Sequence, residues 1–339
     1  MSGTSLDGLD VAYCTFQSTP PLFKINNSIS YPYSKEWKMR LSDADQLSAN
    51  EFAKLDADIT TLFASIINRF IEDCSIDDID AVSSHGHTIF HQPNMGYTVQ
   101  VGSPSYLAAK TGLTVIGDFR TADIALGGQG APLVPIGDRK LFTEFKNRIN
   151  LGGFANISYE KDGNTIAYDV CPLNMGLNIL ANKLGFDFDQ NGSIAKTGNL
   201  SEKLLLELNA IEYYHQKGPK SLGKEWFIKD FYPIIENSTV AVEDKLRTLV
   251  EHSALQINKA MIKGNCLLSG GGTHNDYLVE RIRELSKNEI TIPSASIIDF
   301  KEALIFAYLG YLRLLNKNNV LKSVTGASKD HVAGTIHLP

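Results

Sequence analysis

The sequence has little cysteine and no long hydrophobic run. Its 4 cysteines, in a chain of 339 residues, lie far apart at positions 14, 74, 171 and 266, without metal-ligand spacing. Isolated thiols of this kind are typical of a reducing compartment, so we expect a cytoplasmic protein. No apolar stretch reaches the ~18 residues of a membrane span, and no signal-peptide pattern is present. These shortages argue against a disulfide scaffold and against membrane insertion.

Positive charge is also in short supply. The chain has 32 Lys and Arg against 38 Asp and Glu, which gives a formal net charge of −6. No basic run or basic-aromatic stripe occurs, so nucleic acid and anionic membrane surfaces are not expected partners. The composition, 43% hydrophobic and 21% charged, is typical of a globular chain long enough for two domains with separate cores. A small polar ligand is compatible with this charge.

Glycine-rich turns are the most informative feature that is present. The first turn covers residues 1–10 and leads into an apolar strand pattern at 11–14. Gly3 and Gly8 let the backbone approach an anion, and Asp7 or Asp10 could hold Mg²⁺ through water. The hydroxyl donors for a phosphate are Ser2, Thr4 and Ser5. Such a cluster is by itself an ordinary turn, but similar turns recur far down the chain, which favours phosphate binding.

Strands and helices alternate along the chain. Apolar residues at helical spacing predict helices, and short apolar runs between them predict strands. The predicted helices cover residues 62–71, 105–110, 246–264 and about 300–315. The predicted strands cover residues 79–84, 113–116, 148–151, 165–168 and 266–268. This alternation predicts an α/β fold.

Glycine and polar residues gather where the predicted strands end. The strand at 148–151 enters the turn Gly152-Gly153, and the strand at 165–168 carries Asp169 at its tip. The last predicted strand opens into Ser269-Gly270-Gly271-Gly272-Thr273-His274-Asn275. Open α/β sheets bind their ligands at the carboxyl ends of strands. We therefore expect two similar lobes that face one another across a cleft.

Five ordered motifs resemble those of the anhydro-N-acetylmuramic acid kinase family. They are Met1-Ser2-Gly3-Thr4-Ser5-Leu6-Asp7-Gly8, Gly117-Asp118-Phe119-Arg120, Gly127-Gly128-Gln129-Gly130-Ala131-Pro132-Leu133, Asn150-Leu151-Gly152-Gly153-Phe154-Ala155-Asn156-Ile157 and Ser323-Val324-Thr325-Gly326-Ala327. The resemblance spans nearly the whole chain, which makes it far more specific than a single glycine fingerprint. It implies membership of the sugar kinase, actin and chaperone-ATPase superfamily.

The resemblance implies a two-lobed actin-like ATPase (ribonuclease H-like) fold. Mixed sheets flanked by helices would form each lobe, and the cleft between the lobes would close around ATP. We expect lobe one to cover residues 1–135, completed by the C-terminal helix at about 305–339, and lobe two to cover residues 136–304. A homodimer is also plausible from the resemblance.

The implied reaction is the ATP-dependent opening of 1,6-anhydro-N-acetylmuramic acid with phosphorylation at O6. The product would be N-acetylmuramic acid 6-phosphate, and the pathway would be peptidoglycan recycling. Water must add at C1 while the departing O6 attacks the γ-phosphoryl group, so one carboxylate should activate that water. Asp169 matches the family's general base. Glu302, close to the family's Glu-Ala motif, could orient the water or bind a sugar hydroxyl, or simply favour the start of a helix.

Glycine turns from both halves of the chain are expected to hold Mg-ATP. The expected ATP-binding residues are Ser2, Gly3, Thr4, Ser5, Asp7, Gly8, Gly152, Gly153, Asn156, Gly270, Gly271, Gly272 and Asn275. Asp7 should lie toward the Mg²⁺ ion. The segment 269–275 resembles the superfamily's adenosine motif, in which glycine leaves room for the nucleotide and the next helix offers its N-terminus to an anion. Alternatively, these glycines serve tight packing alone.

The sugar site needs a cation, because muramic acid carries a lactyl carboxylate. Arg120 is the candidate, since a guanidinium can grip a carboxylate through two hydrogen bonds. Its alternative is a structural salt bridge to Asp118 or Asp123. The residues expected to line the sugar site are His85, Gln92, Asp118, Arg120, Gly128, Gln129, Ala131 and Pro132. The histidines at 85, 87 and 91 lack the further ligands of a zinc site.

Three departures from the family pattern keep other functions open. After Asp169 the chain reads Val170-Cys171-Pro172-Leu173-Asn174, where the family has threonine, glycine, proline, glycine and asparagine, and His87 replaces a usual glutamine. Family members also have an apolar strand before the first phosphate turn, so we expect either that Met1 is an internal methionine taken as the start or that upstream residues have been lost. The alternatives are a kinase for a different amino sugar and a nucleotide-dependent sugar sensor without turnover.

Overall fold

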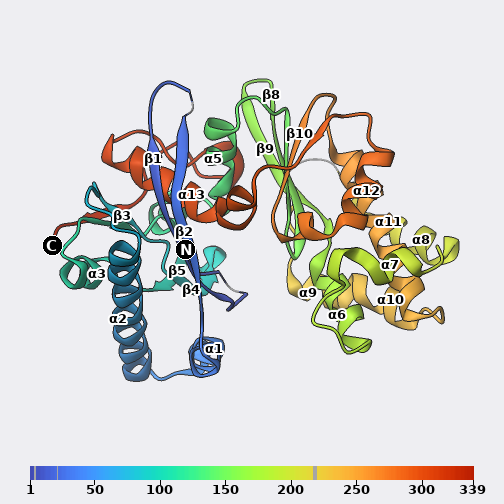
Figure 1. Ribbon diagram of the computed structural model, residues 1–339, viewed down its shortest axis with the longest axis horizontal. Coiled ribbons are helices and arrows are strands. Elements are labelled where there is room, and N and C mark those ends of the chain that lie inside the picture. Colours follow the sequence, from blue (N-terminus) through green and yellow to red (C-terminus); the bar gives the residue numbers. More distant parts are fainter. Residues whose placement is uncertain (4, 21, 217–219) are drawn as a thin grey trace. The chain divides into compact units, whose positions relative to one another are not determined.

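The computed structural model describes residues 1–3, 5–20, 22–216 and 220–339. The chain forms two compact units (Figure 1): unit 1 comprises Met1–Leu141 and Phe300–Pro339, and unit 2 comprises Phe142–Asp299. The chain leaves unit 1 after α5 (Val134–Leu141) and returns to it within α13 (Ala295–Leu314), where the backbone of Phe300 is non-helical. The limits expected from the sequence, 135 and 305, lie a few residues from these crossings.

Unit 1 combines short sheets with one long helix. Its strands are β1 (Gly8–Phe16), β2 (Phe23–Pro32), β3 (Val82–Ser83), β4 (His87–Gln92), β5 (Tyr97–Val101), β6 (Val115–Gly117) and β12 (Thr335–His337). Its other helices are α1 (Lys35–Ser42), α2 (Ala49–Asp73), α3 (Pro104–Thr111), α4 (Thr121–Ala125) and α14 (Lys322–Thr325). β1 pairs with β2 and β4 with β5, both antiparallel, while β6 lies between β3 and β12.

The long helix α2 supports the strand that leads to Arg120. It begins at a capping box, in which Ser48 and Glu51 each accept a hydrogen bond from the other's backbone N–H. Its buried apolar residues recur every three or four positions and are Leu55, Ile59, Phe63, Ile67 and Phe70. Ile59, Phe63 and Ile67 pack in one core with Leu107 of α3 and Val115 of β6. This core fixes β6, whose carboxyl end delivers Asp118 and Arg120.

Unit 2 contains a five-stranded mixed sheet. In spatial order its strands are β11 (Ile290–Thr291), β10 (Cys266–Ser269), β7 (Asn147–Leu151), β8 (Phe154–Lys161) and β9 (Asn164–Pro172). β7, β8 and β9 form an antiparallel meander, β10 is parallel to β7, and β11 is parallel to β10. This is the strand order of a ribonuclease H-like sheet. The predicted α/β class with mixed sheets and two lobes is confirmed, and the cleft between lobes stays a prediction.

Helices pack against the sheet of unit 2 (Figure 1). They are α6 (Asn174–Lys183), α7 (Ser193–Thr197), α8 (Glu202–Asn209), α9 (Lys224–Trp226), α10 (Tyr232–Asn237), α11 (Val242–Ala260) and α12 (Asp276–Leu285). α11 is central, because it contacts α6, α7, α8 and α12 as well as β9. Its Leu249 and Val250 share a core with Ile149, Ile157 and Val170 of the sheet. Among the described residues, no helix has both the length and the apolarity to cross a membrane.

Two elements end elsewhere than the sequence predicts. Asp169 does not lie at a strand tip, because β9 continues to Pro172, where the buried Cys171 pairs with Ala155 of β8. The helix predicted to run to Gly264 ends at Ala260, since the side chain of Asn147 takes over the hydrogen bonds there: its Oδ1 accepts from the Ile262 N–H and its Nδ2 donates to the Ile262 carbonyl.

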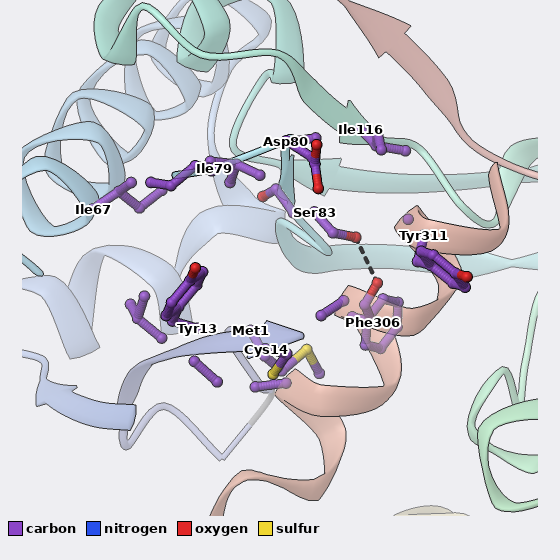
Figure 2. A pocket seen from close by; sticks show the side chains of 18 of the residues that line it. Met1, Tyr13, Cys14, Ile67, Ile79, Asp80, Ser83, Ile116, Phe306 and Tyr311 are labelled. Atoms are coloured by element: carbon purple, nitrogen blue, oxygen red, sulfur yellow. Dashed lines mark hydrogen bonds between the residues drawn. The ribbon is translucent and has the colours of Figure 1, made fainter. Parts of the chain in front are cut away.

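An apolar cavity of about 230 Å³ lies inside unit 1, bordered by β1, α2, β3 and α13 (Figure 2). Its labelled lining includes Tyr13 and Cys14 of β1, Ile67 of α2, and Phe306 and Tyr311 of α13. The hydroxyl of Ser83 in β3 donates to the Phe306 carbonyl at its border. Of the site residues considered from the sequence, Asp10 lines this cavity. Its described lining contains acidic side chains but no Lys or Arg to pair with a nucleotide phosphate or a sugar carboxylate, so the candidate site lies elsewhere.

Candidate active site

The first glycine turn in unit 1 is a tight hairpin. Ser2 bridges Leu9, the Asp10 N–H donates to the Met1 carbonyl, and the Leu6 N–H donates to Gly3 at 3.2 Å. The Ser2 hydroxyl is buried, where it hydrogen-bonds to Tyr33 Oη at 2.6 Å and to His87 Nδ1 at 2.8 Å. The exposed residues of the turn are Ser5 and Asp7. Solvent-facing donors of this turn are therefore its backbone and Ser5; Thr4 lies outside the described residues.

Gly8 has a packing role. A Cβ atom at Gly8 would lie 2.3 Å from the Tyr31 carbonyl oxygen of β2. Only glycine therefore permits this close approach of β1 to β2. Gly3 is different, since a Cβ atom there would meet only the Ser5 hydroxyl, at 3.6 Å.

Arg120 and His85 form the polar centre of unit 1. Arg120 Nε and Nη2 lie 3.1 and 2.8 Å from His85 Nε2, and Arg120 Nη1 donates to the Gly130 carbonyl at 2.7 Å. Because His85 Nε2 faces these donors, its proton is on Nδ1, which donates to the Gly86 carbonyl. Burial, reinforced by the Arg120 charge, lowers the pKa of His85 to about 3. His85 is therefore neutral, and it orients the guanidinium.

The segment 127–132 is held against this pair by Asp123. The fully buried Asp123 carboxylate accepts from the Gly130 N–H at 2.7 Å and from Thr325 Oγ1 at 2.7 Å. The Gln129 N–H also donates to the Thr325 carbonyl, and a Cβ atom at Gly128 would lie 2.2 Å from Asp123. The described residues show no salt bridge from Arg120 to Asp118 or Asp123. Instead, both residues bond to the backbone of Gly130: Arg120 to its carbonyl and Asp123 to its N–H. Ala131 and Pro132 follow Gly130 in the chain.

A smaller cavity adjoins the same residues. Its volume is about 180 Å³, and its polar lining comprises Ser84, His85, Thr98, Gln100, Asp118 and Thr121. Asp118 has a φ of 55° and accepts a hydrogen bond from the Thr121 N–H, which fixes its carboxylate at the start of α4. Such a lining suits the hydroxyl and amide groups of a sugar. Gln92, in contrast, is exposed at the opposite end of β4 from His87.

Glu302 follows the break in α13 and belongs to the electrostatic surroundings of Arg120. Its side chain is exposed to solvent, yet surrounding protein raises the pKa of its carboxyl, and the Arg120 charge opposes that rise. Solvent contact weakens both influences on this carboxyl. The neighbouring Lys301 is buried and pairs with Asp138 of α5 at 2.7 Å, which fixes the helix that presents Glu302.

Unit 2 places four polar residues in one row across its sheet. Ser269 of β10 pairs with Asn150 of β7, Asn150 with Asn156 of β8, and Asn156 with Asp169 of β9. Residues in register on neighbouring strands lie about 5 Å apart and point to the same face. β7 and β10 run parallel, so the turn Gly152-Gly153 and the turn at 270–272 follow this row at the same sheet edge. The strand register thus places Asn156 and Asp169 at the same sheet edge as both predicted glycine turns.

Asp169 sits beside a β-bulge. The register shifts between Ala155 and Asn156, so that Asn156 faces Asp169, Ala155 faces Cys171, and the intervening residue of β9 has no partner. Bulges re-aim side chains and are common next to active sites. Burial raises the pKa of the Asp169 carboxyl, and a hydrogen bond from the Leu222 N–H to its Oδ2, at 2.8 Å, opposes that rise. A carboxylate with a raised pKa is a stronger proton acceptor than a solvated one.

The departures next to Asp169 place core residues where the family has glycines. Cys171 and Leu173 are fully buried in the core of unit 2. Leu173 instead donates its N–H to the Gly153 carbonyl at 2.8 Å, and the Asn174 N–H donates to Gly152. Of the two core residues that replace the family's glycines, Leu173 also braces the Gly152-Gly153 turn.

The third glycine turn combines packing and open positions. Cβ atoms at Gly270 and Gly272 would lie 2.4 Å from Asn150 Oδ1 and 2.7 Å from Leu151 Cβ, whereas nothing lies within 4 Å at Gly271. Gly153 is equally open. The Asn275 side chain is buried and caps α12, accepting from the Leu278 N–H at 2.9 Å. Tight packing explains Gly270 and Gly272 but leaves Gly271 and Gly153 without a structural reason.

For a divalent ion, the described site residues offer one exposed carboxylate rather than a set of several protein ligands. Within the described part of the chain, no group of three or more His, Cys, Asp or Glu residues could hold a metal. The exposed Asp7 alone suits Mg²⁺ that arrives with phosphate oxygens, since Mg²⁺ is commonly held by one or two carboxylates, phosphates and water. Asn150 and Tyr213 also belong to the site, although neither is among the residues predicted for it. Asn150 stands within one of the five motifs, whereas no local sequence pattern marks Tyr213.

Known proteins resemble the chain along its full length. A family model described as anhydro-N-acetylmuramic acid kinase matches residues 1–339. Proteins of that name from Sulfurovum sp. (strain NBC37-1) and Mannheimia succiniciproducens are 36% and 35% identical to it, over 100% and 99% of this chain and 98% and 97% of theirs. The Idiomarina loihiensis protein of the same name is 37% identical over 98% of this chain and 96% of its own.

Proposed function

The chain belongs to the anhydro-N-acetylmuramic acid kinase family, and from this membership we propose that it opens 1,6-anhydro-N-acetylmuramic acid and phosphorylates it at O6 with ATP. The observation that supports this most directly is the row from Ser269 to Asp169, which brings a carboxylate with a raised pKa to the edge that also bears two glycine turns. The product would be N-acetylmuramic acid 6-phosphate, as peptidoglycan recycling requires.

Asp169 would act as the general base. The water oxygen forms a bond to C1 of the sugar while its proton passes to the Asp169 carboxylate. The C1–O6 bond breaks, O6 keeps the electron pair and attacks the γ-phosphorus, and ADP departs as the γ-phosphorus loses its bond to the bridging oxygen. Burial of Asp169 favours this role, because desolvation makes the carboxylate more basic.

Arg120 would bind the lactyl carboxylate. Three of its five N–H groups are engaged by His85 and Gly130, which leaves one N–H on each of Nη1 and Nη2 free for a carboxylate. His85 and Gly130 fix the plane of the guanidinium. The polar cavity beside His85 and Asp118 would take a neighbouring substituent of the sugar, and Glu302 would orient the water or bind a sugar hydroxyl.

The open glycines would face the nucleotide. Gly153 and Gly271 have space where a side chain would be, and the backbone of the first turn, with Ser5, would donate to phosphate oxygens. Asp7 would hold Mg²⁺, which supplies charge neutralisation at the transferred phosphoryl group. A cytoplasmic location and a homodimer complete the proposal, and light scattering coupled to size-exclusion chromatography would test the dimer.

Turnover with identified products tests this function. ATP would be supplied with anhydro-N-acetylmuramic acid, N-acetylmuramic acid or N-acetylglucosamine, and the sugar product identified by mass. We expect product that gains one phosphate and one water from the anhydro sugar alone. Asp169→Asn should lower kcat by about 10²- to 10⁴-fold, the usual contribution of a general base. Asp162→Asn, at the exposed hairpin turn that opens β9, is the matched control and should be as active as wild type.

Each other outcome would identify an alternative. Phosphate transfer only to an unbridged sugar would mean a kinase for a different amino sugar. Binding of ATP and sugar without any product would mean a sensor. Full activity of Asp169→Asn with the anhydro sugar would exclude Asp169 as the base while leaving the reaction itself established.

A further inference from the structure

One segment of unit 2 holds Asp169 at three atoms. Tyr213 Oη donates to the Asp169 carbonyl at 2.6 Å, the Asp169 N–H donates to the Lys220 carbonyl at 3.1 Å, and the Leu222 N–H donates to Asp169 Oδ2 at 2.8 Å. Asp169 therefore has its backbone carbonyl, its backbone N–H and one carboxylate oxygen fixed from outside the sheet. Such a set is needed here, because the adjacent bulge interrupts the ladder that would otherwise hold the residue.

Tyr213 is itself rigidly placed. Its ring is buried and lies 5.3 Å from the Trp226 ring, measured between centroids. Lys220 Nζ donates to the Tyr213 carbonyl at 2.6 Å and lies 4.2 Å from the centroid of the Tyr213 ring. The two residues thus brace one another, and Leu222 follows Lys220 by two positions. A change at Tyr213 would therefore displace Lys220 and, with it, weaken the hydrogen bond from the Leu222 N–H to the Asp169 carboxylate.

We propose that Tyr213 is a positioning residue, braced by Lys220, that fixes the direction of the Asp169 carboxylate through the Asp169 backbone. This rests on the proposed function, in which Asp169 accepts the proton of water. The Tyr213 hydroxyl contacts no carboxylate atom, so it takes no part in proton transfer. Its effect is geometric: it holds the bulged residue so that one carboxylate oxygen meets the Leu222 N–H, while no described residue donates to the other, which would face the water.

The acid limb of the pH profile of kcat would report this geometry. Among the described residues, the titratable groups around Asp169 include the Tyr213 hydroxyl, the Cys171 thiol and, behind Tyr213, the Lys220 ammonium and the Tyr168 hydroxyl. Burial raises the pKa of the Cys171 thiol to about 12 and that of the Tyr213 hydroxyl well above its usual range, so both are neutral at working pH. Weakening the Leu222 bond would remove stabilisation of the charged carboxylate, raise its pKa, and move the acid limb to higher pH.

Tyr213→Phe tests the proposal, with Tyr214→Phe as its matched control. Both tyrosines belong to one aromatic cluster and each gives one hydrogen bond from its hydroxyl, but Tyr214 bonds to His252 Nε2 at 2.9 Å and not to Asp169. We expect Tyr213→Phe to lower kcat about tenfold, as a small displacement of a catalytic group does, with the acid limb at higher pH and the KM for ATP unchanged. Tyr214→Phe should lower thermal stability without either kinetic effect.

The outcomes separate this inference from the proposed function. Equal kinetics for the two tyrosine variants, with an active wild type and an inactive Asp169→Asn, would overturn the role of Tyr213 alone. A wild type without turnover of the anhydro sugar would overturn the function first. If Tyr213→Phe fails to fold, Lys220→Met takes its place, because it removes the brace and keeps the apolar stem; it should shift the acid limb in the same direction, and an unmoved limb would contradict the proposal.

Discussion

At the scale of single residues, the hydrogen bonds of Arg120 require an arginine at this position. Its fork bonds to His85 and Gly130 at the same time and still leaves two N–H groups free. A lysine ammonium cannot span both partners and also bind a carboxylate side-on. We expect Arg120→Lys to raise the KM for the sugar by roughly tenfold or more, the worth of a charged hydrogen bond, with little change in the KM for ATP.

A surface arginine provides the control for that measurement. Arg69→Lys changes an exposed ion pair with Asp73 on α2 and should leave both KM values as in wild type. An Arg120→Lys enzyme with an unchanged sugar KM would mean that Arg120 serves only to fix the segment 127–132. Steady-state kinetics with either substrate varied would decide between these roles.

At the scale of elements, the turn at 270–272 separates packing from ligand binding. A Cβ atom at Gly270 would lie 2.4 Å from Asn150 Oδ1 at a φ of 85°, whereas the position at Gly271 is open. We expect Gly270→Ala to lower the free energy of unfolding by about 1–3 kcal/mol, from backbone strain and overpacking. Gly271→Ala should unfold like wild type and instead raise the KM for ATP. Denaturant unfolding and ATP kinetics of both variants would measure this.

Equal ATP kinetics for Gly271→Ala and wild type would change the interpretation of the turn. The third glycine turn would then serve the contact between β10 and β7 alone. Equal stability of all three proteins would contradict the packing argument itself, because the close approach to Asn150 would then have no energetic consequence.

The fold and part of the site could be predicted from the sequence, because they depend on local patterns. The strand ends at Gly152-Gly153 and Gly270 follow from apolar runs that stop at glycine. Asn275 was expected to bind ATP and instead caps α12, although an asparagine just before an amphipathic helix is a cap signal. The end of β9 was misplaced, because the burial of Cys171 beyond the bulge depends on its partner strand. Tyr213 could not be found at all, since 44 positions separate it from Asp169.

At the scale of the whole molecule, buried neutral histidines make stability depend on pH. Burial lowers the pKa of His85 to about 3, of His87 to about 4 and of His252 to about 3, from the usual 6.5. At a pH between 6.5 and these lowered pKa values, the histidines bind protons in the unfolded chain but not in the folded chain. Stability from these groups is therefore complete above pH 6.5 and is lost as pH falls, by at most about 1.4 kcal/mol per pH unit for each histidine. The raised pKa values of Asp169 and Glu302 act in the opposite direction at lower pH.

His252 isolates this effect, because it is fully buried in unit 2 and is not one of the candidate site residues. Its two nitrogens bond to Asn209 Oδ1 and Tyr214 Oη, both at 2.9 Å. We expect wild type to lose stability from about pH 7 to about pH 5, and His252→Gln to lose less over the same interval, because glutamine does not titrate. Urea unfolding across that interval measures the difference. Parallel slopes would contradict the prediction, because they would mean that His252 takes up a proton in the folded protein as readily as in the unfolded chain.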